Sequence, residues 1–164
     1  MKKSIFLVLT LALILAIVPA GLAKKPAPSL RCTTEYDFVG YLEIVDGEGR
    51  TLVWEGPISG DIEGVIQWWI DLDAITRKGA VSHYDCRWVI LESDEDGAAV
   101  LLAGEESGST TAHEGKDSIW RTNGTVIEAS EEFEDWIGRQ NHADGNAEFP
   151  PGLPPSGSGT FRVN

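Results

Sequence analysis

The stretch AVSHYDCRWVILE, residues 80–92, has the clearest strand pattern in the chain. Apolar or aromatic side chains recur at every second position, at Tyr84, Cys86, Trp88 and Ile90. Because consecutive side chains of a strand point to opposite faces, this spacing predicts a strand with one buried face. The acidic, glycine-containing segment that follows predicts a turn.

The same alternation recurs along most of the chain, with turn-forming residues between the segments. Such segments are 33–45, 50–56, 64–73, 98–104, 118–122, 125–129 and 160–164. Many short strands without a long amphipathic helix favour an all-β fold over an α/β fold. We therefore expect an antiparallel closed barrel of about eight short strands, with a β-sandwich as the alternative. The barrel is favoured because the last strand could pair with the first and leave no exposed edge.

Two features of the last third of the chain refine this expectation. Asn123 and Gly124 both accept positive φ, so the pair predicts a two-residue hairpin turn. Further on, Phe133, Trp136 and Ile137 have the i, i+3, i+4 spacing of a helix. A helix this short is not stable alone, so we expect it to pack these side chains against one end of the barrel as a plug.

The N-terminus has the composition of an export signal. Lys2 and Lys3 precede a long apolar run that ends in small residues. This pattern predicts a signal peptide at 1–23, with an uncleaved anchor as the alternative. We then expect a linker at 24–30 and a single β-barrel domain at 31–164, secreted or held in the cell envelope.

The charge of the chain limits its partners. The formal net charge is −13, with 26 acidic and 13 basic residues. Nucleic acids and anionic lipid surfaces are polyanions, so we expect neither nucleic acid nor, in the mature form, a membrane as partner. A small-molecule partner remains compatible with this charge.

The chain has two cysteines, Cys32 and Cys86. Both fall on the apolar face of their strands, and exported proteins commonly oxidise such pairs. The sequence therefore predicts one disulfide between them, with two buried free thiols or a redox pair as the alternatives.

The closing part of the chain resembles small calycin-like barrels of the allene-oxide-cyclase and dirigent kind. The matching positions are Gly124, Val126, Ala129, Ser130, Phe133, Gly138, Gly145 and Gly159-Thr160-Phe161. The resemblance covers about the last third of the chain and implies a closed barrel. That family includes a cyclase of fatty-acid epoxides and proteins that guide radical coupling without being oxidases. No catalytic motif of the family aligns here, and avidin and lipocalin barrels remain alternatives.

Several polar and aromatic residues are candidates for a site. Glu128, His142 and His83 could act in general acid–base catalysis. Arg139 could hold an anion, and Trp69 lies on the polar side of its strand, where an aromatic face could contact a sugar or a flat apolar ligand. The bland alternative is a solvated surface on which these side chains, with Asp144, stay near water and form weak ion pairs.

The three histidines do not have the spacing of a metal site, so we expect neither a metal nor a cofactor. The first functional hypothesis is a secreted barrel that binds a small apolar or sugar-like ligand without catalysis. The alternatives are a cofactor-free isomerase or cyclase acting in the barrel mouth, and a structural or interaction module of the cell envelope. A hollow interior would favour the first two over the third.

Overall fold

The computed structural model describes residues 29–43, 50–111 and 117–164. The expected signal peptide and most of the expected linker lie outside these ranges, so they stay predictions. Within the described ranges, no helix has the length and apolar character needed to cross a membrane.

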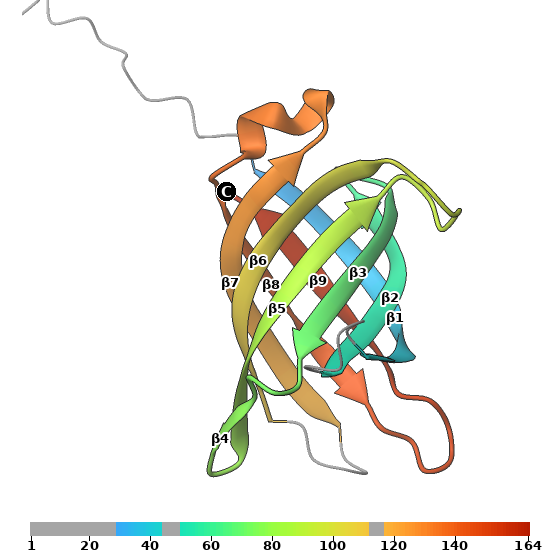
Figure 1. Cartoon of the computed structure of the whole chain (residues 1–164), viewed down its shortest axis with the longest axis vertical. Helices are drawn as coiled ribbons and strands as arrows, with labels where there is room; N and C mark the ends of the chain where they lie inside the picture. Colours follow the sequence, from blue (N-terminus) through green and yellow to red (C-terminus); the bar gives the residue numbers. More distant parts are fainter. Residues whose placement is uncertain (1–28, 44–49, 112–116) are drawn as a thin grey trace, which may run out of the picture.

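The described part of the chain consists of strands and one short helix (Figure 1). The strands are β1 (Leu30–Glu43), β2 (Arg50–Gly60), β3 (Gly64–Asp71), β4 (Thr76–Lys78), β5 (Val81–Leu91), β6 (Val100–Thr110), β7 (Ser118–Ala129), β8 (Gln140–Glu148) and β9 (Ser156–Val163). The 3₁₀ helix η1 (Glu131–Trp136) lies between β7 and β8.

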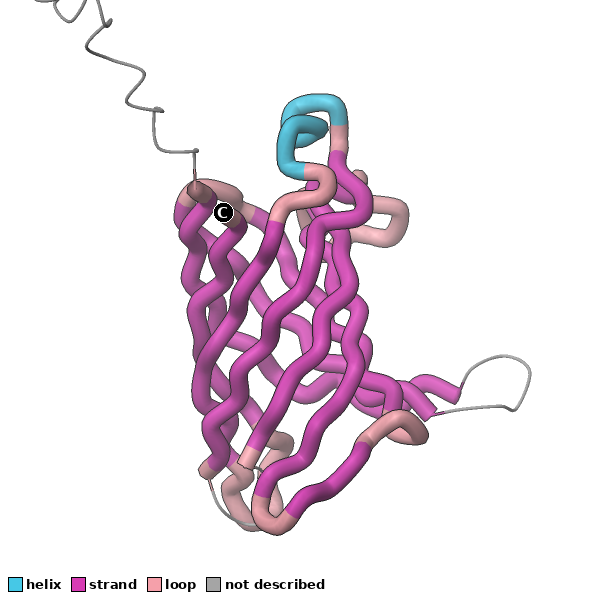
Figure 2. The backbone as a smooth tube through the Cα atoms, turned by 90° about the vertical axis from the view of Figure 1, so that its left-hand side faces the viewer, coloured by secondary structure: helices cyan, strands magenta, loops and turns pink. Residues whose placement is uncertain are grey.

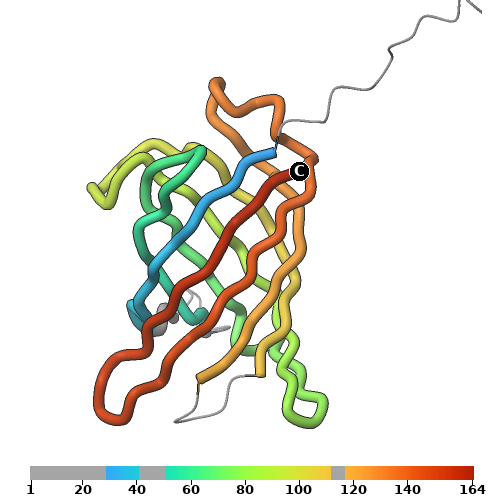
Figure 3. The backbone as a smooth tube through the Cα atoms, turned by 180° about the vertical axis from the view of Figure 1, so that it is seen from behind, coloured from blue at the N-terminus to red at the C-terminus, as the bar shows by residue number. Residues whose placement is uncertain are grey.

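Eight of these strands form a closed antiparallel barrel (Figure 2). The sheet order is β3-β2-β1-β9-β8-β7-β6-β5, and pairing of β3 with β5 closes the ring. The first and last strands lie side by side, with Leu30 opposite Val163 and Cys32 opposite Phe161 (Figure 3). The closed barrel is therefore confirmed and the sandwich is wrong. The short strand β4 pairs only with the start of β5 and extends this hairpin beyond one end of the barrel (Figure 1).

The predicted hairpin at Asn123-Gly124 is wrong, because β7 runs through both residues without a turn. Gly124 has no positive φ and pairs with Glu106 on one side and Asn141 on the other. A Cβ on Gly124 would lie 2.1 Å from the carbonyl oxygen of Glu105. The glycine is therefore required by the close approach of neighbouring backbones and not by a turn.

One half of the barrel is filled by side chains. Fully buried residues gather toward the end that carries η1; among them are Ile66, Trp88, Ile90, Leu102, Val126, Phe161 and Val163. Trp88 is 1% exposed, and its ring lies over Gly104, where a Cβ would come within 2.4 Å of the indole. Trp88 also meets Phe161 edge to face, with ring centroids 4.7 Å apart. The alternating pattern of β5 therefore points its apolar face inward, as expected.

The expected plug is present only in part. Phe133 and Trp136 of η1 are partly buried and pack against the core. Ile137, however, is 49% exposed, so its predicted burial is wrong. Ile137 follows the last residue of a 3₁₀ helix and has non-helical backbone angles, with φ of −57° and ψ of 130°, so it does not continue an α-helical stripe. The guanidinium of Arg139 lies over the Trp136 ring, 4.7 Å from its centroid.

The predicted disulfide is wrong, because Cys32 and Cys86 are both buried free thiols. Both side chains point inward, as their strand parity predicted, but they belong to β1 and β5. Strands β2 and β3 separate these two strands in the barrel wall. The alternation of side chains along a strand thus predicts that each cysteine points inward, but it does not predict the distance between the two cysteines around the barrel.

The two thiols are expected to stay unmodified in the folded protein. Burial raises the pKa of both Cys32 and Cys86, so the reactive thiolate is scarce at neutral pH. Alkylation without reductant, read by mass spectrometry, should be slow for the native chain and complete at both positions in denaturant. Peptides of Cys32 and Cys86 linked under non-reducing conditions would contradict this expectation.

Candidate functional site

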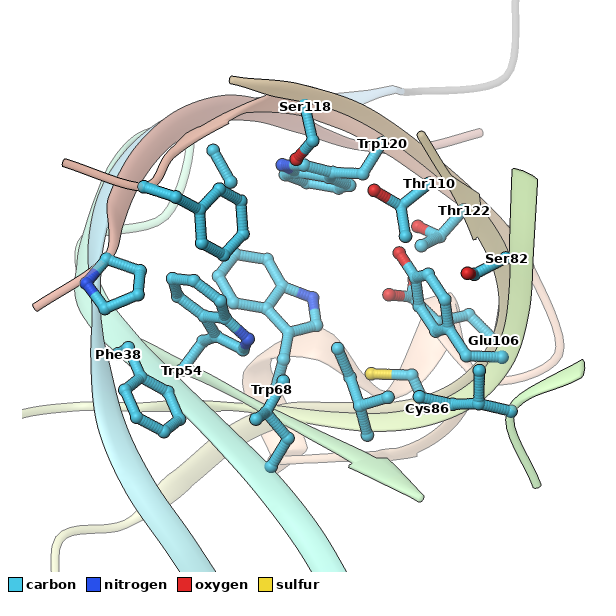
Figure 4. Close-up of a pocket in the computed structure, with 17 residues that line it drawn as sticks. Phe38, Trp54, Trp68, Ser82, Cys86, Glu106, Thr110, Ser118, Trp120 and Thr122 are labelled. Carbon is cyan, nitrogen blue, oxygen red and sulfur yellow. The ribbon is translucent and has the colours of Figure 1, made fainter. Parts of the chain in front are cut away.

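The half of the barrel opposite η1 contains a cavity of about 290 Å³. It opens at the end that carries β4 and the β8–β9 connection, and residues from seven of the eight barrel strands contribute to its lining. Figure 4 shows the lining side chains inside the ring of strands, with Trp68 near the middle of the view. The volume is close to the lower end of the range of about 300–1,000 Å³ that is typical of small-molecule sites.

One side of the cavity is apolar and largely aromatic. It is formed by Phe38, Leu52, Trp54, Trp68 and Ile70 of β1, β2 and β3, with Ile75, Phe149 and Pro155 at the mouth. The strand residues among them occupy the inward positions of their strands. The same alternation that places apolar side chains in the filled half of the barrel therefore places them around the cavity.

Tyr36 holds three of the cavity tryptophans in place. Its ring meets the rings of Trp54, Trp68 and Trp120 edge to face, with centroids 5.6, 5.6 and 5.8 Å apart. The Tyr36 hydroxyl donates to the carbonyl oxygen of Asn146 at 2.7 Å and accepts from the indole nitrogen of Trp120. The aromatic wall is therefore preorganised by contacts that exist without a ligand.

The opposite side of the cavity carries the polar groups. The hydroxyls of Ser82, Thr110 and Thr122 lie along this side in Figure 4, across from Phe38, Trp54 and Trp68. The remaining polar lining comes from Tyr84, Cys86, Glu106 and Ser118. The cavity is thus divided between an aromatic side and a side with hydrogen-bonding groups.

Glu106 is the only acidic or basic side chain among the described residues that line the cavity. It is 4% exposed, and its Oε2 accepts a hydrogen bond from Nδ2 of Asn141 at 2.7 Å. Glu106 lies on β6 and Asn141 on β8, with Gly124 of β7 between them in register. Because Gly124 has no side chain, the amide of Asn141 can reach across β7 to the carboxyl group.

Burial raises the pKa of Glu106 to about 7. The polar groups of Thr122, Asn141 and Trp68 lie close enough to limit this rise. Even so, Oε1 of Glu106 and Nε1 of Trp68 form no hydrogen bond of acceptable geometry with the described residues. Since buried polar groups are normally paired, these two unpaired atoms, both buried in residues that line the cavity, mark where a polar group of a ligand would be stabilised.

Glu106 was missed by the sequence analysis because the expected strand ended at Gly104. In the structure, β6 continues to Thr110, and the inward positions Gly104, Glu106 and Gly108 follow one another. Tyr84 lies over Gly108 in the same way as Trp88 lies over Gly104. The available signal in the sequence was an acidic residue between two glycines at alternate positions. Glycines that leave room for a neighbouring aromatic ring mark the inward face of a barrel strand, so the residue between them also points inward.

The candidates that the sequence suggested for acid–base catalysis lie away from this cavity. Glu128 and His83 are exposed on the outer wall, on β7 and β5. His142 is half-buried on the outer side of β8, where its ring nitrogen bonds to the side-chain oxygen of Asn123. The structure therefore does not bring these three side chains together.

The two residues suggested for ligand binding also lie outside the cavity. Arg139 lies beside η1, at the filled end of the barrel. Trp69 is half-buried on the outer wall, in register with Val53 and Arg87 of the neighbouring strands. Asp144, which was expected near water, pairs on the outer wall with Arg162 at 3.0 Å.

Within the described ranges, no group of three or more His, Cys, Asp or Glu side chains has the arrangement of a metal site. Comparison of the chain with protein-family models, curated proteins and solved structures found no match. The functional argument therefore depends on the geometry of the cavity.

Proposed function

We propose that the protein binds a small, mainly apolar ligand in the hollow half of its barrel. The observation that carries this proposal is the cavity of about 290 Å³ with an aromatic side, in a barrel whose other half is filled. Apolar side chains around an empty cavity lack packing contacts on one side. An apolar ligand in the cavity would supply these contacts and stabilise the complex.

The preorganised rings support this proposal. The contacts of Tyr36 with Trp54, Trp68 and Trp120 fix the shape of the aromatic side before a ligand arrives. A rigid, preformed site loses little conformational entropy on binding. The apolar character of this side favours an apolar ligand over a sugar, since a sugar needs hydrogen-bonding partners around its ring.

We also propose that the protein acts outside the cytoplasm, on the basis of the signal-like residues 1–23. The closed eight-stranded barrel is compatible with kinship to the allene-oxide-cyclase and dirigent-like barrels, and this kinship remains part of the proposal.

The neutral fluorescent probe N-phenyl-1-naphthylamine tests the binding function. Its emission is expected to rise with saturation at one molecule per chain, because the probe enters an apolar site next to Trp54, Trp68 and Trp120. Ala147 lines the same cavity and is buried, so Ala147→Trp should fill the space and weaken probe binding roughly tenfold or more.

The matched control is Ala99→Trp. Ala99 is exposed between β5 and β6, at the filled end of the barrel, so this variant should bind the probe as the unchanged protein does. Thermal unfolding of both variants checks that each is folded. Equal binding by Ala147→Trp and Ala99→Trp would show that the probe binds elsewhere and would refute the proposal.

A second candidate function is a cofactor-free isomerase, and Glu106 is the observation that favours it. A cavity carboxyl with a pKa of about 7 suits proton transfer to and from an apolar substrate at neutral pH. Glu106 could remove a proton next to a carbonyl group and return it to another carbon. Conversion of a β,γ-unsaturated ketone to its conjugated isomer, followed by ultraviolet absorbance, tests this function; Glu106→Gln should abolish it.

A further inference from the structure

We propose that the ligand is a small organic cation, an amine joined to a flat apolar group, and that the Glu106 carboxylate is its counter-charge. This inference rests on the binding function proposed above and names the class of ligand. It follows from the charge of the cavity, from the unpaired Oε1 of Glu106 and from the aromatic rings near it.

None of the described side chains that line the cavity brings a positive charge to the Glu106 carboxylate. No Lys, Arg or His is among the described residues that line the cavity. Asn141 donates a neutral hydrogen bond to Oε2, while Oε1 has no hydrogen-bond partner in the described part of the chain. A buried carboxylate without a cation is costly, so a ligand with an ammonium group would supply the missing charge.

The aromatic side of the cavity, together with Trp120 of β7, also suits an amine on a flat apolar group. Trp54, Trp68 and Trp120 present ring systems to the space beside Glu106. An ammonium group is attracted to the faces of such rings, most strongly to tryptophan, while a flat apolar body stacks on them. The same cavity repels an anionic ligand, because Glu106 would face it with a like charge.

The electrostatic field of the whole chain also favours a cationic ligand. Its formal net charge is −13, which attracts cations toward the molecule from a distance. The sign of this field matches the sign that Glu106 requires of a ligand.

Binding of an amine should depend on pH through Glu106. The other titratable groups that face it are Tyr84 and Cys86 from β5, and Tyr36 of β1 lies next to Tyr84. Burial raises the pKa of all three, so they stay uncharged at neutral pH. The side chains of Trp68, Thr122 and Asn141, from β3, β7 and β8, do not titrate.

The sign of the pH effect follows from the state of the carboxyl group. Since burial raises the Glu106 pKa to about 7, the group is mostly protonated at pH 5.5 and mostly ionised at pH 8.5. An aliphatic amine keeps its charge over this range, because its own pKa is about 10. Amine affinity should therefore rise from pH 5.5 to pH 8.5, by at most roughly 30-fold, the change in the ionised fraction of Glu106.

Isothermal titration calorimetry with two matched probes tests the proposal. The probes are 2-(1-naphthyl)ethylamine and the neutral 2-(1-naphthyl)ethanol, which have the same apolar body. At pH 8.5 the amine should bind roughly tenfold or more tightly than the alcohol, and at pH 5.5 this preference should shrink toward none. Glu106→Gln should remove the preference at both pH values.

The matched control is Glu105→Gln, on the adjacent, outward-facing position of β6. Glu105 is exposed and pairs with Arg87 on the outer wall, so this variant should keep the amine preference. Equal affinity of amine and alcohol for the unchanged protein at pH 8.5, or an amine preference that survives in Glu106→Gln, would overturn the proposal. Saturable binding of N-phenyl-1-naphthylamine would then still support the binding function, whereas failure of all three probes would refute both.

Discussion

Replacing Trp88 by alanine is expected to lower the free energy of unfolding by about 3–5 kcal/mol. The side chain is 1% exposed, lies over Gly104 and meets Phe161 edge to face. Its removal leaves a void inside the barrel. The surrounding side chains cannot move in to fill this void, because their strands are closed into a ring. Since a domain of this size has about 5–15 kcal/mol of stability in total, the variant should unfold at much lower denaturant concentration.

Trp69→Ala is the matched control for Trp88→Ala. Trp69 belongs to the neighbouring strand but is half-buried on the outer wall, so its loss should cost about 1 kcal/mol. Urea unfolding followed by circular dichroism measures both variants. Equal losses at the two positions would contradict the assignment of Trp88 to a filled interior and Trp69 to the outside.

Gly124→Ala is expected to cost about 3 kcal/mol or more, at the upper end of the range for overpacked interiors. The added Cβ would lie 2.1 Å from the carbonyl oxygen of Glu105 and 2.5 Å from Cβ of Glu106. Strands β6 and β7 would have to separate, and the hydrogen bond from Asn141 to Glu106 would be strained or lost. Thermal unfolding should show a large drop in the midpoint.

Gly97→Ala is the control for this substitution. Gly97 lies in the β5–β6 turn with φ of +83°, and a Cβ there meets no atom within 4 Å. Gly97→Ala loses only the ease with which glycine adopts a positive φ, so the free energy of unfolding should fall by about 1 kcal/mol. If Gly124→Ala proved no worse than Gly97→Ala, the close approach of β6 and β7 at Gly124 would be wrong.

Much of the fold follows from side-chain alternation. The inward faces of β3 and β5 were predicted from parity, and Trp68, Tyr84, Trp88 and Ile90 are buried as expected. Closure by the last strand beside the first was also predicted and is confirmed. Alternation succeeds here because one face of each strand must be buried whatever the details of packing.

The errors arise where local signals have more than one physical origin. Glycine at 124 suits a hairpin turn and also suits a strand whose neighbour lies too close for a Cβ, and only the second occurs. Cys32 and Cys86 have matching parity, but parity says nothing about distance around the barrel. Ile137 follows a 3₁₀ helix, whose three-residue turn does not extend the stripe that an α-helix would have.

The site itself could not be predicted from alternation. Whether one half of the barrel is filled or hollow depends on how rings from opposite walls pack. In the filled half, Trp88 meets Phe161. In the other half, Trp54 and Trp120 both pack against Tyr36. Glu128, His142 and His83 were acid–base candidates because of their residue types, which do not determine whether a side chain faces the cavity. The carboxyl group that enters the cavity, Glu106, belongs to a strand extension that the analysis did not recognise.

Crystals of the protein soaked with N-phenyl-1-naphthylamine would show directly whether the hollow half of the barrel binds an apolar ligand. Density is expected for one probe molecule in the cavity, with its ring system against Trp54 and Trp68, and for no probe in the filled half around Trp88. A cavity closed by its own side chains, or a probe bound only on the outer wall, would contradict the claim that the hollow half of the barrel is the binding site.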